Sequence, residues 1–98
     1  YYVKKIIMGD YFSFLWYKEA LNLIKDKVPE YEFNTLFNHV EFYSYDVENN
    51  LLTVNVPSLS VYESIENNPL LLFTLKQVLT KVFGDGIKLS YLVPVVKN

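Results

Sequence analysis

The first part of the chain carries apolar residues at the spacing of an amphipathic helix. Over residues 12–27 and just beyond, these residues lie four, three and four positions apart, and they are Tyr17, Leu21, Ile24 and Val28. This spacing places all four on one face of an α-helix. The helix should end near Val28, because Pro29 disfavours helical backbone in the residue before it.

A second, shorter helix follows directly. Its apolar residues fall at i, i+3, i+4 and i+7, and they are Phe33, Leu36, Phe37 and Val40. Pro29 suits a first helical turn, and the acids Glu30 and Glu32 are favourable at the partially positive end of a helix. We therefore predict a helix that begins at Pro29.

Residues 41–56 have the pattern of a β-hairpin. Residues 41–47 are rich in aromatic and β-branched side chains, and residues 52–56 alternate between apolar and polar. Between them stand Glu48, Asn49 and Asn50, and asparagine tolerates the positive φ angle of a tight turn. The second strand should end at Pro57.

Two more helices and a strand complete the pattern. Ser60, with Glu63 three residues later, has the form of a capping box and predicts a helix to about residue 66. Asn68 and Pro69 then cap and open a fourth helix, which Gly84 can end. The apolar stripe of this helix is Leu72, Leu75, Leu79 and Val82, and the last strand alternates through Ile87, Leu89, Tyr91 and Val93.

The element order is thus α-α-β-β-α-α-β. Three strands with helices grouped around them predict an α+β fold, with a three-stranded sheet that is covered by helices on one face and partly open on the other.

Residues 1–11 are expected to lie outside this domain, which then covers residues 12–98. Met8 and Gly9 look like a native start preceded by leader or added residues. The stretch is too short for a secretory signal and lacks the small-residue cleavage pattern of one.

Composition and charge narrow the function. The chain has 98 residues, enough for one core and one small site. Its net charge of −2 has the wrong sign for a phosphate-binding surface, so nucleic acid is expected to be at most a weak ligand. Apolar runs such as residues 69–73 are far shorter than the roughly 20 residues that a membrane span needs, so no membrane contact is expected.

Candidate chemistry is sparse. The chain has no cysteine and one histidine, His39, so a zinc site would have to consist almost wholly of carboxylates, which zinc rarely accepts. No serine, aspartate or glutamate near His39 has the pattern of a catalytic triad. The three glycines match neither the motif of a dinucleotide-binding site nor that of a phosphate-binding loop. We expect no catalytic residue, no metal and no cofactor, and hence no enzymatic activity.

The first predicted helix, over residues 12–27, also carries a second apolar stripe. Trp16, Ala20 and Leu23 lie at i, i+4 and i+7, beside the stripe assigned to the core. This second stripe is either a further part of the core or an exposed docking patch, in which a tryptophan would serve as anchor and an alanine would allow close helix approach.

Three stretches resemble a known family, the N-terminal domain of the bacterial chromosomal replication initiator, DnaA. They are residues 15–24, LWYKEALNLI, residues 32–35, EFNT, and residues 51–58, LLTVNVPS. The closing residues 84–94, GDGIKLSYLVP, are also similar to the last strand of that family. The resemblance runs from about Phe14 to Val96 and rests on the order and spacing of these stretches.

The resemblance implies a variant of the KH-like fold and a cytoplasmic protein that works in replication initiation. It implies weak self-association through helix one, where the tryptophan column of the family falls on Tyr17. It implies contact with replicative helicase at Glu32, and docking of initiator regulators near Ser58, Leu59 and Ser60. Glu32 can also be interpreted as an acid that only stabilises a helix N-terminus, and Ser60 as a residue that only caps a helix.

Some positions depart from the family pattern. Leu36 stands where relatives carry a second tryptophan, and Ser60 and Ser64 stand where they often carry aromatic residues. The Gly-x-x-Gly loop of KH modules corresponds here to residues 66–69, ENNP, which has no glycine and includes an acid. We therefore predict a protein-interaction module. The alternatives are a stand-alone regulator that competes for the same partners and a KH-like binder of single-stranded nucleic acid, in which tyrosines would stack on bases.

Overall fold

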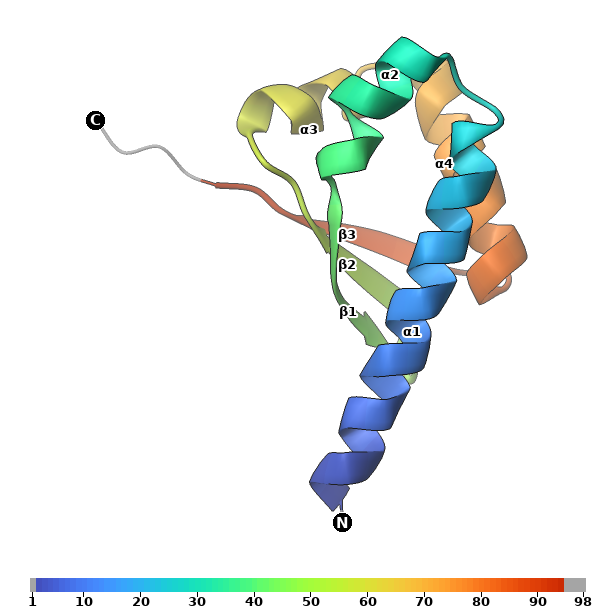
Figure 1. Cartoon of the computed structure of the whole chain (residues 1–98), viewed down its shortest axis with the longest axis vertical. Helices are drawn as coiled ribbons and strands as arrows, with labels where there is room; N and C mark the ends of the chain where they lie inside the picture. The colour runs from blue at the N-terminus through green and yellow to red at the C-terminus, as the bar shows by residue number, and fades with distance from the viewer. Residues whose placement is uncertain (1, 95–98) are drawn as a thin grey trace.

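One mixed sheet of three strands, in the order β1-β2-β3, organises the molecule (Figure 1). The computed structural model describes the backbone of residues 2–94 and the side chains of residues 12–94. The strands are β1 (Glu41–Asp46), β2 (Leu51–Asn55) and β3 (Lys88–Leu92). β1 and β2 form the predicted antiparallel hairpin, whereas β3 runs parallel to β2.

The hairpin turn follows from its asparagines. Asn50 has a φ of 51°, the positive value that asparagine tolerates and most residues avoid. The carboxylate of Asp46 accepts hydrogen bonds from the backbone N–H groups of Glu48 and Asn49 and from the Asn49 amide. These bonds, with that of the Asn49 side chain the largest, lower the pKa of Asp46.

Helices cover one face of the sheet. They are α1 (Tyr2–Lys25), α2 (Glu30–Thr35), a 3₁₀ turn η1 (Phe37–His39), α3 (Leu59–Glu66) and α4 (Pro69–Phe83). α1 and α4 run side by side in opposite directions, and α1 also packs against β1 (Figure 1). α3 and α4 together form the crossover that a parallel β2–β3 pair requires. The predicted α+β fold and element order are therefore confirmed.

The core lies between the sheet and the helices. Alternate residues of the central strand, Leu52 and Val54, point towards the helices and are almost fully buried. They pack in one cluster with the largest fully buried helical side chains, which are Ile24, Ile65, Val78 and Leu79.

α4 agrees with the sequence prediction in most details. The side chain of Asn68 accepts a hydrogen bond from the Leu71 N–H at 3.2 Å, and Pro69 occupies the first turn. Leu75 and Leu79 are buried as predicted, while Leu72 and Val82 are half-buried at the edge of the core. Gly84 ends the helix with a φ of 102°.

The helix from Pro29 was predicted to be longer than it is. Pro29 is the residue before the helix, with a ψ of 144°, and α2 ends at Thr35. η1 follows as a separate tighter turn, in which Val40 N–H bonds to the Phe37 carbonyl at 3.1 Å. A change from α to 3₁₀ geometry is common at helix ends, and here it keeps Phe33, Phe37 and Val40 in the core while the chain enters β1.

α1 begins earlier than predicted, since its backbone is helical from Tyr2 rather than from Phe12. Its first turns extend past the end of the sheet (Figure 1). Whether residues 1–11 contribute to the core depends on side chains outside the described residues, so their exclusion from the domain stays a prediction.

Candidate functional site

Ala20 corrects the proposed second stripe of α1. Its side chain is fully buried, so it cannot belong to an exposed docking patch. The core face of α1 is in fact the series i, i+4, i+7 and i+11, consisting of Ser13, Tyr17, Ala20 and Ile24. Ala20 has the helical spacing of Trp16 and Leu23, but its side chain belongs to the core face, whereas Trp16 is exposed and Leu23 is half-buried.

Tyr17 is buried in the core, as its helical spacing predicted, which leaves little of its side chain exposed for the self-association that the resemblance implies at this position. Its hydroxyl group donates a hydrogen bond to the Val40 carbonyl at 2.8 Å. Burial, with a smaller contribution from the nearby Glu41 carboxylate, raises the pKa of Tyr17 well above its usual range. The position that corresponds to the tryptophan column of the family therefore serves packing in this chain.

Trp16 is held against the fold and remains 44% exposed. Its ring makes edge contacts with Tyr45 of β1, at 6.5 Å between centroids, and with Phe83 at the end of α4, at 5.9 Å. Edge-to-face contacts of this kind fix the orientation of an aromatic ring. Trp16 therefore presents a preoriented apolar surface to solvent.

Two neighbours on α1 extend this surface. Phe12 is 50% exposed and Leu15 is 42% exposed, and with Trp16 they occupy positions i, i+3 and i+4 of the helix. We call Phe12, Leu15 and Trp16 the α1 apolar patch. Phe12 and Leu15 are not among the predicted interaction residues, although their helical spacing from Trp16 could have identified them.

Glu32 lies in the first turn of α2, as predicted, and is half-buried. It lines a hollow of about 150 Å³ together with Lys27, Asn68 and Leu70. Leu70 is 76% exposed, so an acid and an exposed leucine stand at the same hollow. This combination suits a polar partner surface with one apolar anchor.

The segment before α3 contains a second correction. Ser58, not Ser60, caps α3, because the Ser58 hydroxyl accepts a hydrogen bond from the Val61 N–H at 3.2 Å. The helix thus begins at Leu59, and Ser60 is an exposed residue of its first turn. Leu59 is 54% exposed beside a hollow of about 510 Å³ between α3 and β3.

Tyr62 and Tyr91 form the wall of that hollow, with ring centroids 5.0 Å apart. Tyr91 donates a hydrogen bond to the Glu66 carboxylate at 3.1 Å. Burial and the Glu66 charge raise the pKa of Tyr91 above its usual range. The Glu66 carboxylate is thereby fixed at the end of α3, next to the α3–α4 loop.

The predicted positions do not form one site. The α1 apolar patch lies near the middle of α1, whereas α2 and α3 lie towards the C-terminal end of that helix (Figure 1). In the part of the chain that is described, no three of its histidine, aspartate and glutamate side chains are grouped to hold a metal ion. None of the described helices is long and apolar enough to span a membrane.

Comparison with known proteins supports the resemblance seen in the sequence. The chain is 40% identical over 84 residues to the chromosomal replication initiator protein DnaA of Bacteroides fragilis, and equally to that of Bacteroides thetaiotaomicron. Each alignment covers 86% of this chain but only 17% of the initiator. No protein-family model matches the chain. The resemblance to DnaA is therefore confirmed, and its extent is consistent with an N-terminal domain.

Proposed function

From the similarity to DnaA, we propose that this chain is a protein-interaction module of a DNA replication initiator. Its work is self-association and the recruitment of replicative helicase or of initiator regulators in the cytoplasm. The observation that carries this proposal is the α1 apolar patch on a domain that is 40% identical to the initiators. The role is non-enzymatic and needs no cofactor.

Self-association fits the α1 apolar patch because the patch is compact and lies along one helix. Two copies can bury it through a two-fold contact in which each α1 packs against its symmetry mate. Trp16 is suited to be the anchor, since tryptophan is enriched among residues that dominate binding energy. Few anchors must offset the entropy of association, so we expect a micromolar or weaker dimer.

Helicase recruitment is assigned to Glu32 on the resemblance and on its position. The carboxylate is half-buried beside the exposed Leu70 side chain, which gives a partner both a charge and an apolar contact. A purely structural role at the N-terminus of α2 would be shared with Glu30, which lies in the same first turn. Glu30 therefore provides a matched control.

The test is a calorimetric titration of this chain with the replicative helicase of Bacteroides fragilis. The corresponding segment of the Bacteroides fragilis initiator serves as the positive control. We expect binding that Glu32→Gln weakens by about fivefold or more, while Glu30→Gln changes it by less than about twofold. The proposal fails if the positive control binds and this chain does not, and the role of Glu32 fails if both variants behave alike.

A further inference from the structure

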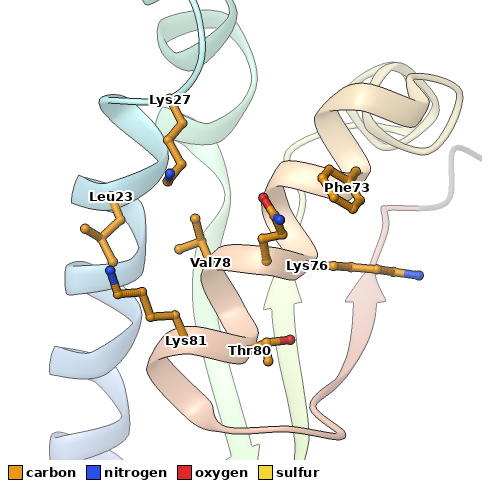
Figure 2. Close-up of a pocket in the computed structure, with 8 residues that line it drawn as sticks. Leu23, Lys27, Phe73, Lys76, Val78, Thr80 and Lys81 are labelled. Atoms are coloured by element: carbon orange, nitrogen blue, oxygen red, sulfur yellow. The ribbon is translucent and has the colours of Figure 1, made fainter.

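We propose that the groove between α1 and α4 binds an acidic amphipathic helix of a partner protein. The groove has a volume of about 600 Å³ and is lined by Leu23 of α1, by Lys27 just after that helix and by residues of α4 (Figure 2). At Lys27 it meets the hollow that contains Glu32, but it shares no lining residue with the hollow beside α3. This inference concerns a third surface, and it holds or fails independently of the proposed self-association.

The floor of the groove is apolar. Leu23 of α1 is half-buried, and Val78 of α4 is 2% exposed and faces it from the other side (Figure 2). Phe73, on the side of α4 away from α1, is 58% exposed and widens the apolar surface (Figure 2). Val78 is already buried and forms the base of the groove, whereas the exposed apolar surface of Leu23 and Phe73 would be removed from water by apolar side chains of a partner.

Positive charge surrounds this floor. Lys27 and Lys81 lie at opposite ends of the groove, with Leu23 and Val78 between them, and Lys76 is directed away from α1 (Figure 2). The lining residues contain these three lysines and no aspartate or glutamate. The whole chain has a net charge of −2, so the charge of the groove is opposite to that of the protein.

A helix fits this groove better than an extended segment. The lining residues of α4 run from Phe73 to Lys81, which corresponds to about 12 Å, or two helical turns, at 1.5 Å per residue. A third helix laid between α1 and α4 would place apolar side chains at i and i+4 over Leu23 and Val78. Acidic side chains one turn before and after these anchors would then reach Lys27 and Lys81.

The apolar floor also distinguishes a peptide from a nucleic acid. Proteins bind single-stranded nucleic acid through several phosphate contacts along a basic groove and through aromatic rings on which the bases stack. Here Lys27 and Lys81 frame aliphatic side chains, and the lining has a single aromatic residue, Phe73, where the stacking of successive bases needs several rings (Figure 2). We therefore infer that the occupant is a helix of a protein.

The probe is a fluorescein-labelled, capped helical peptide of about 14 residues, with leucines at i and i+4 and glutamates on the flanking turns. A second peptide carries lysine in place of each glutamate. Fluorescence anisotropy with the 98-residue chain should show saturable binding of the acidic peptide, at least about tenfold tighter than that of the basic one, and weakening as salt is raised.

Variants assign the binding to the groove. The double substitution Lys27→Glu and Lys81→Glu should weaken binding of the acidic peptide by about tenfold or more. Lys88→Glu on β3, a single charge reversal outside the groove, should change this binding by less than about twofold. Leu15→Glu, in the α1 apolar patch, should also change the affinity for the acidic peptide by less than about twofold. This result would separate the groove from the surface proposed for self-association.

Several results would overturn the proposal. They are the absence of binding at chain concentrations of about 1 mM, equal binding of both peptides, or equal loss in the groove variant and in Lys88→Glu. Full displacement of the peptide by a single-stranded oligonucleotide of comparable affinity would assign the groove to nucleic acid instead.

Discussion

The Tyr17 hydroxyl group donates a hydrogen bond of 2.8 Å to the Val40 carbonyl, 23 residues further along the chain. Both residues are buried, at 4% and 5% exposure. A buried carbonyl without a partner is costly, so this bond ties α1 to the segment that leads into β1. The next residue back on the helix, Trp16, points in a different direction and is 44% exposed.

Tyr17 should make the fold sensitive to alkaline pH. Burial raises the pKa of its hydroxyl in the folded protein above the ordinary value of 10.0, so the unfolded chain ionises first as pH rises. The stabilising effect is complete below about pH 10, and above it the free energy of unfolding should fall by up to about 1.4 kcal/mol per pH unit for this group.

Urea denaturation of the wild type and of Tyr17→Phe between about pH 8 and pH 11 measures this effect. Tyr17→Phe should cost about 1–3 kcal/mol at neutral pH, because the Val40 carbonyl loses its partner. It should also show a shallower alkaline decline of the free energy of unfolding, because only Tyr91 then has a pKa that is known to be raised in the folded protein. Parallel declines in the two proteins would contradict the assignment.

Leu79 should be among the positions least tolerant of truncation. It is 1% exposed in the middle of α4, and Leu→Ala at such sites costs about 2–5 kcal/mol. Leu70→Ala is the control, since Leu70 lies on the same helix and is 76% exposed. Thermal denaturation should show a drop of many degrees for Leu79→Ala and little change for Leu70→Ala. Similar melting temperatures for the two variants would mean that the core has been misplaced.

The start of α3 can be tested by a pair of serine substitutions. Ser58→Ala removes the side chain that accepts the Val61 N–H and should destabilise the protein by about 0.5–2 kcal/mol. Ser60→Ala changes an exposed helical residue and should leave the free energy of unfolding within about 0.5 kcal/mol. The capping box predicted from the sequence would require the reverse order, so chemical denaturation of both variants decides between the two starts.

Single-stranded nucleic acid should bind poorly at physiological salt. The chain has a net charge of −2, and the loop between α3 and α4 has no glycine while the adjacent Glu66 carboxylate is held by Tyr91. A fixed acid at this loop repels phosphate and excludes the backbone approach that KH modules use. Fluorescence anisotropy should therefore detect no submicromolar binding near 150 mM salt, and such binding would refute this prediction.

Much of this fold could be predicted because its signals are local. The asparagine turn at Asn50, the cap at Asn68 and the end of α4 at Gly84 each depend on the conformational preferences of one or two residues, and the structure confirms all three. The parallel pairing of β2 with β3 depends on how α3 and α4 pack between them, which no short sequence pattern specifies.

The errors arose where two local patterns compete. Ser58 and Ser60 are both acceptable caps, and the chain begins α3 at the earlier one. Ala20 fits either the core face of α1 or its flank by spacing alone, and only the approach of neighbouring elements decides that it is fully buried. The α1–α4 groove was missed because its lining comes from two segments about fifty residues apart in sequence.

The most direct test of the proposed interaction module is sedimentation velocity on the wild type and on Trp16→Ala, with Leu70→Ala as the control for an exposed apolar side chain. Circular dichroism shows whether each variant is folded. Trp16→Ala loses two ring contacts, so a modest loss of stability of about 1–3 kcal/mol is expected without loss of helicity. We predict that the wild type and Leu70→Ala form a dimer with a dissociation constant of roughly micromolar or weaker, and that folded Trp16→Ala stays monomeric. A wild type that remains monomeric at about 1 mM, or a folded Trp16→Ala that dimerises like the wild type, would contradict self-association through α1.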